Sequence, residues 1–417
     1  MAHIDDLIRT AVFADDATAK SEARKRIHMQ ARQSGAISTS IFPLYDAIGR
    51  GEISRQFTVP AFNIRALTYD VARALFRAAM RHDVGAFIFE IARSEIGYTE
   101  QRPAEYAACV LAAAIAENYK GPVFIQGDHF QASAKKWQTD DGRAAEIKAL
   151  ESLIDEAIAA EFYNIDIDTS TLVDLSFPTR DKQQRTNYEY TAHFTKYIRA
   201  REPKGITVAV GGEIGEVGKY NTQPDEVRAY IDGVLRLLDG TTGMDKISVQ
   251  TGTSHGGVPM ADGSIAEAKI DFGVLREVTE ICRNEYRIAG SVQHGASTLS
   301  EEVFNHFPEN NAVEIHLATG FQNMILDAPT LPQSMKDEIR AFCFEHCTDE
   351  RKSGETDEQF VYKTRKKAIG PFKQRMWDLG DDAKQPIIDA IEKKFEFLMD
   401  KLGVFGTKDL VSKYVPV

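Results

Sequence analysis

Several features are scarce in this 417-residue chain, and each absence excludes a class of protein. Four cysteines are too few for the disulfide framework of a small secreted domain. No apolar run approaches the roughly 18 residues that a membrane-spanning helix requires. The first twenty residues, MAHIDDLIRTAVFADDATAK, carry acidic side chains and lack the apolar core of a signal peptide. We therefore expect a soluble protein of the cytoplasm.

The chain also lacks an excess of positive charge. Fifty lysine and arginine residues stand against 62 aspartate and glutamate residues, which gives a formal net charge of -12. Such a surface repels phosphate backbones and anionic lipids, so we expect neither nucleic acid nor a membrane surface as a partner. A small anionic substrate is still compatible with this charge, because a local site of metal and backbone amides can outweigh the global field.

Short runs rich in Val, Ile and Phe alternate with longer segments of helical period from Phe57 onward. Between the first two runs, Val71, Leu75 and Ala79 repeat at a spacing of four residues, which indicates an amphipathic helix. Eight strands that are each followed by a helix predict an α/β fold, a closed (β/α)8 or TIM barrel. The eight runs cover residues 57–64, 84–92, 122–129, 162–170, 206–214, 246–254, 288–295 and 312–319.

The chain divides into three parts on this reading. Residues 1–50 are expected to form an N-terminal helical segment, and residues 51–330 the barrel, which is the catalytic domain. Residues 331–417 are expected to form a C-terminal helical extension, in which KQPIIDAIEKKFEFLMDKL is the clearest amphipathic segment.

Polar side chains gather at the C-terminal ends of the predicted strands. In a parallel barrel these ends meet at one mouth, which is where active sites lie. The chain has ten histidines, and because four of them lie at these ends we favour a convergent polar site over four histidines packed in the core. The residues at the strand ends are Asn63, Glu90, Asp128, His129, Asp168, Glu213, His255, His294 and His316.

Three imidazoles from separate strands, with a carboxylate nearby, suit a divalent ion such as zinc with an open coordination position. A histidine that binds a metal also needs a hydrogen-bond partner for its second ring nitrogen, and Gln126, Asp166 and Asp168 are candidates for that role. An open metal site indicates polarisation of a carbonyl group or activation of water.

Glycines follow two of these histidines, since Gly256 follows His255 and Gly295 follows His294. Backbone amides beside a glycine can approach an anion closely. We expect Ser297 to open a helix whose N-terminus could hold a phosphate. The alternative reading is an ordinary serine N-cap with a glutamate three or four residues further on.

Five motifs in order resemble the class II (metal-dependent) fructose-bisphosphate aldolase family over about residues 57–320. The chain resembles a divergent long member of it, with some likeness to subunits of tagatose-bisphosphate aldolase in the second strand end, FEIARSE, and in a long polar helix before the fourth strand. The motifs are VPAFNI (59–64), QGDHF (126–130), GEIGEVG (212–218), GTSHGG (252–257) and QHGAS (293–297).

The resemblance implies a role for each matching residue. His129, His255 and His294 would bind the metal, most simply zinc, with Glu213 as a fourth or alternative ligand. Asp128 would exchange the proton of the hydroxyl at the bond being cleaved.

The resemblance also implies a set of substrate contacts. Gly256, Gly295 and Ser297 would hold the phosphate of a dihydroxyacetone-phosphate moiety, with help from Thr319, and Asn63 is a further candidate. His316 stands where the family has an amide that positions the intermediate. Arg93 could pair with a distal phosphate, sulfonate or carboxylate.

The implied activity is that of an aldehyde-lyase of carbohydrate metabolism, as in glycolysis. It would cleave or form a carbon–carbon bond in a ketose 1-phosphate or bisphosphate through a metal-bound enediolate. Its partner would be a small sugar phosphate, and the family likeness implies a homo-oligomer, a dimer or a tetramer. The alternatives are a sugar-phosphate epimerase that uses the same retro-aldol chemistry and a non-catalytic subunit of a tagatose-bisphosphate-type aldolase.

One departure concerns proton transfer. The family carries a glycine-rich loop with a catalytic glutamate after the segment that GEIGEVG resembles, and here the chain runs directly into KYNTQPDE. Glu216 or Asp225 could substitute for that glutamate.

Overall fold

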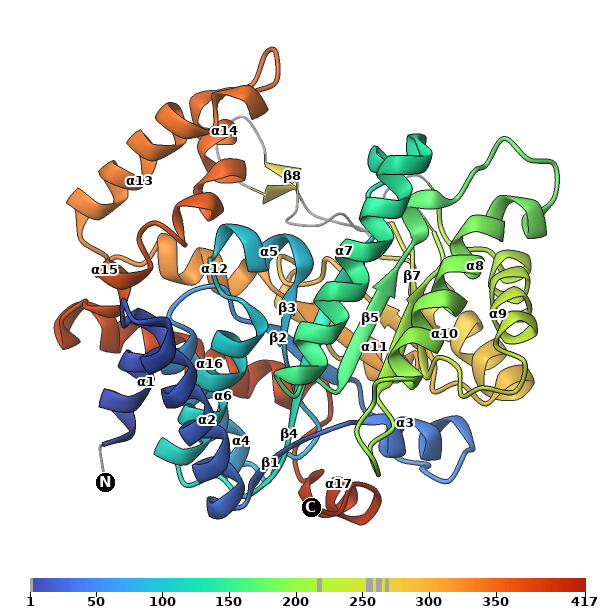
Figure 1. Cartoon of the computed structure of the whole chain (residues 1–417), viewed down its shortest axis with the longest axis horizontal. Helices are drawn as coiled ribbons and strands as arrows, with labels where there is room; N and C mark the ends of the chain where they lie inside the picture. Colours follow the sequence, from blue (N-terminus) through green and yellow to red (C-terminus); the bar gives the residue numbers. More distant parts are fainter. Residues whose placement is uncertain (1–2, 216–219, 253–257, 260–264, 267–269) are drawn as a thin grey trace.

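Eight parallel strands close into a barrel in the computed structural model (Figure 1), which describes residues 3–215, 220–252, 258–259, 265–266 and 270–417. The ring is closed by pairing between β4 and β5. Every strand expected from the sequence is present, which confirms the (β/α)8 fold. In sequence order the barrel strands are β2 (Val59–Asn63), β3 (Ile88–Ala92), β4 (Gly121–Gln131), β5 (Asn164–Asp168), β6 (Ala209–Glu213), β7 (Lys246–Val249), β10 (Ser291–Gln293) and β11 (Glu314–Leu317).

Helices follow the strands and surround the barrel. Val71, Leu75 and Ala79 are buried on α4, as the spacing of four residues predicts. The α-helices of the barrel are α4 (Thr68–Arg81), α5 (Arg93–Tyr98), α6 (Pro103–Ala116), α7 (Asp140–Ala159), α8 (Arg180–Arg199), α9 (Pro224–Leu238), α10 (Phe272–Ile281), α11 (His306–Glu309) and α12 (Thr319–Leu326). Short turns of other helix types are η1 (Lys136–Gln138), η2 (Ser170–Leu172), η3 (Cys282–Tyr286) and η4 (Glu301–Val303). Two further strands, β8 (Val258–Pro259) and β9 (Ile265–Ala266), pair in antiparallel orientation.

The N-terminal segment differs from expectation in one respect, because it contains a strand. Helices α1 (Ile4–Phe13), α2 (Ala17–Ser34) and α3 (Phe42–Gly49) are present, but β1 (Ala36–Thr39) lies between the last two. Gly35 ends α2 in the left-handed conformation, and the chain then pairs in parallel with the start of β4. The alternation of AIST is too short to stand out beside the helical pattern around it.

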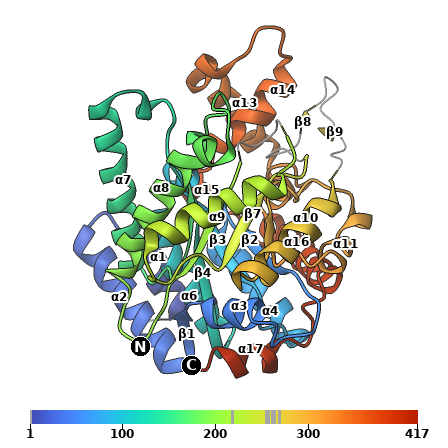
Figure 2. The same ribbon diagram turned by 90° about the vertical axis from the view of Figure 1, so that its right-hand side faces the viewer.

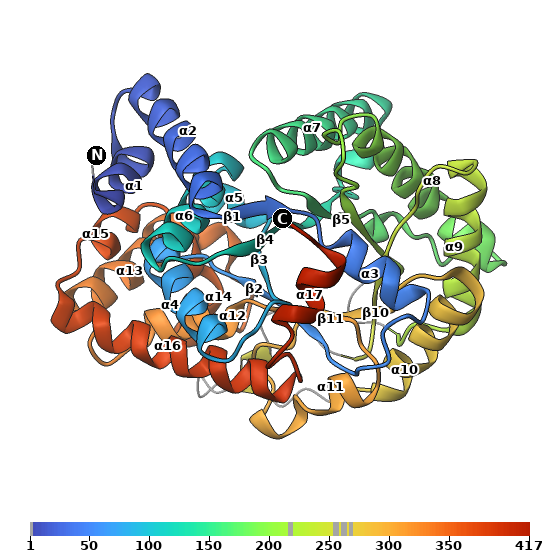
Figure 3. The ribbon, with the colours of Figure 1, turned by 90° about the horizontal axis from the view of Figure 1, so that it is seen from below.

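The C-terminal extension is helical, as expected, and it contacts both ends of the barrel. Helices α13 and α14 stand above the C-terminal ends of the strands (Figure 2), whereas α17 lies with α3 at the opposite end (Figure 3). Its elements are α13 (Gln333–His346), η5 (Thr348–Glu350), α14 (Asp357–Thr364), η6 (Arg365–Ala368), α15 (Lys373–Trp377), α16 (Asp381–Lys401) and α17 (Lys408–Tyr414). No helix in the described part of the chain is long and apolar enough to cross a membrane.

Candidate active site

A cavity of about 560 Å³ opens at the C-terminal ends of β3, β4, β10 and β11. It brings together most of the residues that the sequence proposed for the site. Two others, His255 and Gly256, lie outside the described residues. The proposed residues that line the cavity are Arg93, Asp128, His129, His294, Gly295, Ser297, His316 and Thr319, and it also includes Glu90, Arg65, Glu95, Tyr98 and Lys366.

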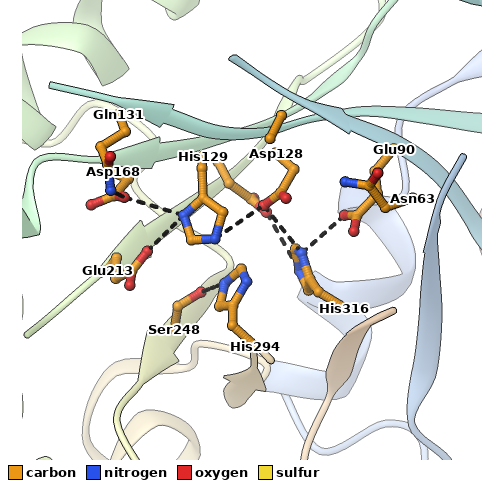
Figure 4. A network of polar contacts seen from close by, with 12 residues as sticks. Asn63, Glu90, Asp128, His129, Gln131, Asp168, Glu213, Ser248, His294 and His316 are labelled. Atoms are coloured by element: carbon orange, nitrogen blue, oxygen red, sulfur yellow. Dashed lines mark hydrogen bonds and ion pairs between the residues drawn. The ribbon is translucent and has the colours of Figure 1, made fainter. Parts of the chain in front are cut away.

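A bulge in β4 allows two consecutive side chains to face this cavity. Neighbouring side chains of a regular strand point to opposite faces. Here the register with β5 shifts between Gly127 and Phe130, and His129 adopts a positive φ of 41°. Bulges of this kind re-aim side chains next to active sites. Asp128 and His129 consequently lie together, with His129 Nε2 3.7 Å from Asp128 Oδ1 (Figure 4).

Gly127 is required by this bulge. A Cβ atom at Gly127 would lie 2.5 Å from the ring of Phe130, which is closer than side-chain carbons can approach. The glycine in the QGDHF motif therefore serves the geometry that presents the aspartate and the histidine.

The two described histidines of the predicted metal site each have a polar partner. His129 Nδ1 lies 3.1 Å from Asp168 Oδ2, and His294 Nε2 lies 2.8 Å from Ser248 Oγ. Such partners fix the ring orientation of metal-binding histidines. Of the three candidates expected for this role, Asp168 fills it for His129, and Ser248 was not foreseen.

The donor set fits a divalent ion. His129, Glu213 and His294 offer ligand atoms within 4.8 Å of one another, and Asp128, His294 and His316 form a second such group. Two imidazoles with a carboxylate suit zinc at a site with an open position. The first group contains the described ligands that the sequence predicted.

The carboxylates beside His129 differ in their affinity for protons. Burial and the nearby Asp168 raise the pKa of Glu213 to about 7, although His129 offsets part of this effect. Burial alone would raise the pKa of Asp168, but hydrogen bonds from His129 and Ser170 hold it below its ordinary value. Asp168 is therefore held in its ionised form, whereas Glu213 is the carboxylate beside His129 that can change its protonation near neutral pH.

His129 itself is held as a cation. Burial lowers its pKa, but the charges of Asp128 and Glu213 outweigh this and raise the pKa well above its ordinary value. A metal ligand must be a neutral imidazole, so binding of a cation here would release a proton.

His316 lies between carboxylates on both sides. Its Nδ1 is 2.9 Å from Glu90 Oε2 and 3.2 Å from Asp128 Oδ1, and its Nε2 is 2.7 Å from Glu314 Oε1. Burial raises the pKa of Glu90 to about 8, even though His316 lowers it. Glu90 therefore holds a proton more readily than an exposed glutamate. Its Oε1 is buried and has no hydrogen-bond partner among the residues that the structure describes.

Asn63 is close to the site but supports it indirectly. Its Nδ2 donates to Glu95 Oε2 over 2.7 Å, and Glu95 in turn pairs with Arg65 at 2.6 Å. Asn63 is not among the residues that line the cavity, whereas Arg65 and Glu95 are. The amide thus positions an ion pair at the cavity wall.

Arg93 lines the cavity but is already bonded. Its guanidinium pairs with Glu146, whose side chain is fully buried on α7, and donates to the backbone oxygen of Gln131. The group expected to meet a distal anion therefore joins α5 to the end of β4 and to α7.

Lys366 was not foreseen, and it belongs to the C-terminal extension. It lines the same cavity as Arg65, and its Nζ lies 5.6 Å from the centre of the Tyr98 ring. Burial and the charge of Arg65 lower the pKa of Lys366. Two cations thus stand beside the single carboxylate of Glu95 at this side of the cavity.

The expectation that Ser297 opens a helix is wrong. Residues 295–299 form turns, and the next helical turn, η4, begins only at Glu301. Instead the helix that begins at the cavity is α12, which starts at Thr319. Ser297 Oγ accepts a hydrogen bond from the amide of Gly320 in that helix, over 3.1 Å. The helix N-terminus expected after β10 is thus provided after β11.

Asp225 does not replace a catalytic glutamate in this structure. It lies at the start of α9, exposed, and pairs with Arg180 at 3.0 Å. The other candidate, Glu216, lies outside the described residues.

Two charged residues inside the barrel, Lys246 and Glu314, were not identified from the sequence motifs. Their signal is strict alternation in KISV (246–249) and EIHL (314–317), where every second residue is polar. Because successive strand residues face opposite sides, the polar members of each run point into the barrel.

The comparisons with known proteins identify the family of this chain. Residues 52–399 match the family model described as "Fructose-bisphosphate aldolase class-II". The chain therefore belongs to the class II fructose-bisphosphate aldolase family. No curated protein sequence is significantly similar to it.

Three solved structures share the fold. A fructose-bisphosphate aldolase from Campylobacter jejuni is 16% identical, with a TM-score of 0.52 over 89% of this chain and 96% of that one. A putative fructose-1,6-biphosphate aldolase from Coccidioides immitis is 15% identical, with a TM-score of 0.50 over 88% and 97%. A probable tagatose 6 phosphate kinase from Sinorhizobium meliloti 1021 is 16% identical, with a TM-score of 0.55 over 86% and 91%.

Proposed function

We propose that this protein is a divalent-metal aldolase that cleaves or forms a carbon–carbon bond in a ketose phosphate. The observation that carries the proposal is the bulge in β4, which presents Asp128 and His129 to one cavity together with His294. A retro-aldol step needs a base for a hydroxyl and, a short distance away, a sink for the electrons of the broken bond.

The residues divide these tasks. A divalent cation, zinc by the donor set, would polarise the ketone when bound. His129 and His294 would hold it, together with Glu213, whose carboxylate lies within 4.8 Å of their ligand atoms. Asp128 would take the hydroxyl proton at the bond that breaks, because its carboxylate is buried at the cavity wall beside His129.

Anionic groups of the substrate have two places to bind. The N-terminus of α12, with Thr319, Ser297 and Gly295 beside it, suits a phosphate because helix N-termini carry partial positive charge. Arg65 and Lys366 line the same cavity and would meet a second anionic group of the substrate. This arrangement supports a ketose that carries two charged groups.

The decisive experiment combines metal analysis with an assay of ketose 1-phosphates and bisphosphates for release of a triose phosphate. We expect about one divalent ion per chain, loss of the ion in His294→Ala, and loss of cleavage but not of the ion in Asp128→Asn. Loss of a proton-transfer group typically lowers the rate about 100- to 10,000-fold. A metal-free wild type that supports a partner enzyme would instead indicate a non-catalytic subunit.

The product distinguishes cleavage from epimerisation. A sugar phosphate of unchanged carbon number would show that the same chemistry serves an epimerase, and it would refute the cleavage proposal. The homo-oligomer and the cytoplasmic location stay predictions from the sequence, and light scattering of the purified chain tests the first of them.

A further inference from the structure

A buried charged cluster lies inside the barrel, directly below the cavity. Lys246 on β7 bonds to Glu314 on β11, and its Nζ lies 3.0 Å from Asp166 Oδ1 on β5. The same ammonium group donates to Gln126 Oε1 on β4 over 2.7 Å. Lys246 is 1% exposed and Glu314 is fully buried. Four strands therefore meet at one lysine, and we call Lys246, Asp166, Gln126 and Glu314 the interior cluster.

Packing alone does not account for the interior cluster. The interior of a TIM barrel is usually filled by branched apolar side chains. Removing charges from water costs several kcal/mol per ion even when they are paired. The chain also reserves space for the cluster, because a Cβ atom at Gly211 would lie 2.2 Å from Asp166 Oδ1 and 2.9 Å from Lys246 Cε.

The cluster is not a metal site. Asp166, Glu314 and His316 have ligand atoms close enough to share an ion, but the Lys246 ammonium group already lies among them. Tyr45 donates from its hydroxyl to Glu314 Oε2 over 2.5 Å. Both oxygens of Glu314 are thus bonded within the protein, and its orientation is fixed.

The cluster reaches the site through the His316 ring, and Gln126 Nε2 also donates to Glu90 Oε2 over 3.1 Å. Glu314 Oε1 lies 2.7 Å from His316 Nε2, and the opposite nitrogen of that ring faces Asp128 Oδ1 at 3.2 Å (Figure 4). A ring held at one nitrogen cannot rotate without breaking that contact. The contact with Glu314 therefore determines the direction in which the His316 ring presents Nδ1.

We propose that Glu314 and Lys246 are positioning residues that hold His316 against Asp128. Lys246 fixes Glu314, Glu314 fixes the His316 ring, and the ring fixes the carboxylate of Asp128 at the cavity wall. This inference rests on the proposed role of Asp128, and it names the part of the barrel on which the geometry of that residue depends.

The test uses the full-length, metal-loaded protein and the variants Glu314→Gln and Asp245→Asn. Glu314→Gln keeps the shape of the side chain but replaces one carboxylate oxygen with an amide group and removes the negative charge that Lys246 and His316 contact. We expect kcat to fall about 10- to 100-fold, as for other supporting hydrogen bonds of catalytic sites, with KM and metal content little changed. Asp245→Asn is the matched control, because Asp245 is buried next to Lys246 but bonds the amide of Val210.

A second variant tests the proposal in case Glu314→Gln does not fold. Lys246→Met combined with Asp166→Leu removes one positive and one negative charge together, which buried sites often tolerate. We expect a folded protein with the same loss of kcat. If either variant is folded and metal-loaded yet keeps kcat within about two-fold of the wild type, the proposal is wrong.

Crystal structures of the wild type and of Glu314→Gln provide a readout that does not depend on activity. We expect His316 Nδ1 to face Asp128 in the wild type and the ring to turn in the variant. A ring that is turned in the wild type, or unmoved in the variant, overturns the inference. A wild type that cleaves no ketose phosphate would refute the proposed function, while the ring positions would still decide the positioning role.

Discussion

The two faces of the barrel strands differ in a way that separates folding from chemistry. On β5, β7 and β11 the inward residues are charged or polar, such as Asp166, Lys246 and Glu314, whereas their outward neighbours are Ile165, Ile247 and Ile315. All of these side chains are buried. The outward face packs in the apolar core with the surrounding helices, and the inward face carries the ion pairs below the cavity.

This difference shows which face can carry function. Apolar burial against helices is non-directional and tolerates many sequences, so the outer face stabilises the barrel without fixing any polar atom. Buried ion pairs depend on geometry and are costly when a partner is lost. The inner face therefore orients side chains at a cost in stability. Apolar burial on the outer face offsets that cost.

The largest effect should follow from placing a charge on the outer face. Ile315→Asp would bury a carboxylate without a partner on the outward face of β11. Its chain neighbours Glu314 and His316 face the opposite side of the strand. The cost of several kcal/mol is comparable with the whole stability of a domain, about 5–15 kcal/mol, so we expect loss of folded, soluble protein by circular dichroism.

The matched control for that variant is Ile315→Val, which should cost about 0.5–1.5 kcal/mol. A cooperative unfolding transition of Ile315→Asp near the wild-type temperature would show that the two faces are not distinct in this way.

A smaller effect should follow from closing the space around the interior cluster. Gly211→Ala would push a methyl group into Asp166 and Lys246, and overpacking of this kind costs about 1–3 kcal/mol. We expect a lower midpoint in urea and a lower kcat.

Gly97→Ala on α5 is the control for this substitution, since no described atom outside the adjacent residues and the helix backbone lies within 4 Å of the added Cβ. It should leave kcat near the wild-type value and should not lower the urea midpoint, because alanine favours a helix more than glycine does. Equal stability of the two variants would argue against a tightly packed interior cluster.

A third effect concerns the dependence of stability on pH. Burial raises the pKa of Asp245 to about 8, although Lys246 lowers it, whereas an unfolded aspartate titrates near about 4. Between these values the folded state keeps a proton that the unfolded state releases. The stability that this group contributes is therefore complete below about pH 4 and is lost as the pH rises toward 8.

Asp245→Asn removes this dependence. Urea unfolding at several pH values between 5 and 8 should show the free energy of unfolding of the wild type falling relative to the variant as the pH rises. Parallel profiles for the two proteins would show that Asp245 does not hold its proton.

The site was predictable where a residue's role follows from its place at a strand end. Asp128, His129, His294 and His316 meet at one cavity because parallel strands end at the same side of a barrel. Arg93 illustrates the limit, since its partner Glu146 lies 53 residues away on α7. Nothing in the local sequence around an arginine shows whether a distant glutamate will bond it.

The expected anion site is a second example in which the local sequence did not show a tertiary contact. Ser297 and Thr319 both lie at the cavity, but the helix begins at Thr319. The residues STLSEE favour a helix start by their types alone, whereas the chain after Ser297 forms turns that bring its hydroxyl to Gly320. Local propensity is a weak guide when tertiary contacts decide where a helix begins.

The amino-acid sequence by itself determined the number and order of the barrel strands, because hydrophobic period is local and eight βα units can close in one ring. It also determined which strand-end residues stand at the mouth, because strand ends are read directly from the runs. Only the tertiary structure decided that β4 bulges at His129, that Lys246 bonds Glu314, and that Lys366 of the C-terminal extension reaches the cavity. These contacts join residues that are distant in the chain, and their distances follow from how the whole molecule packs.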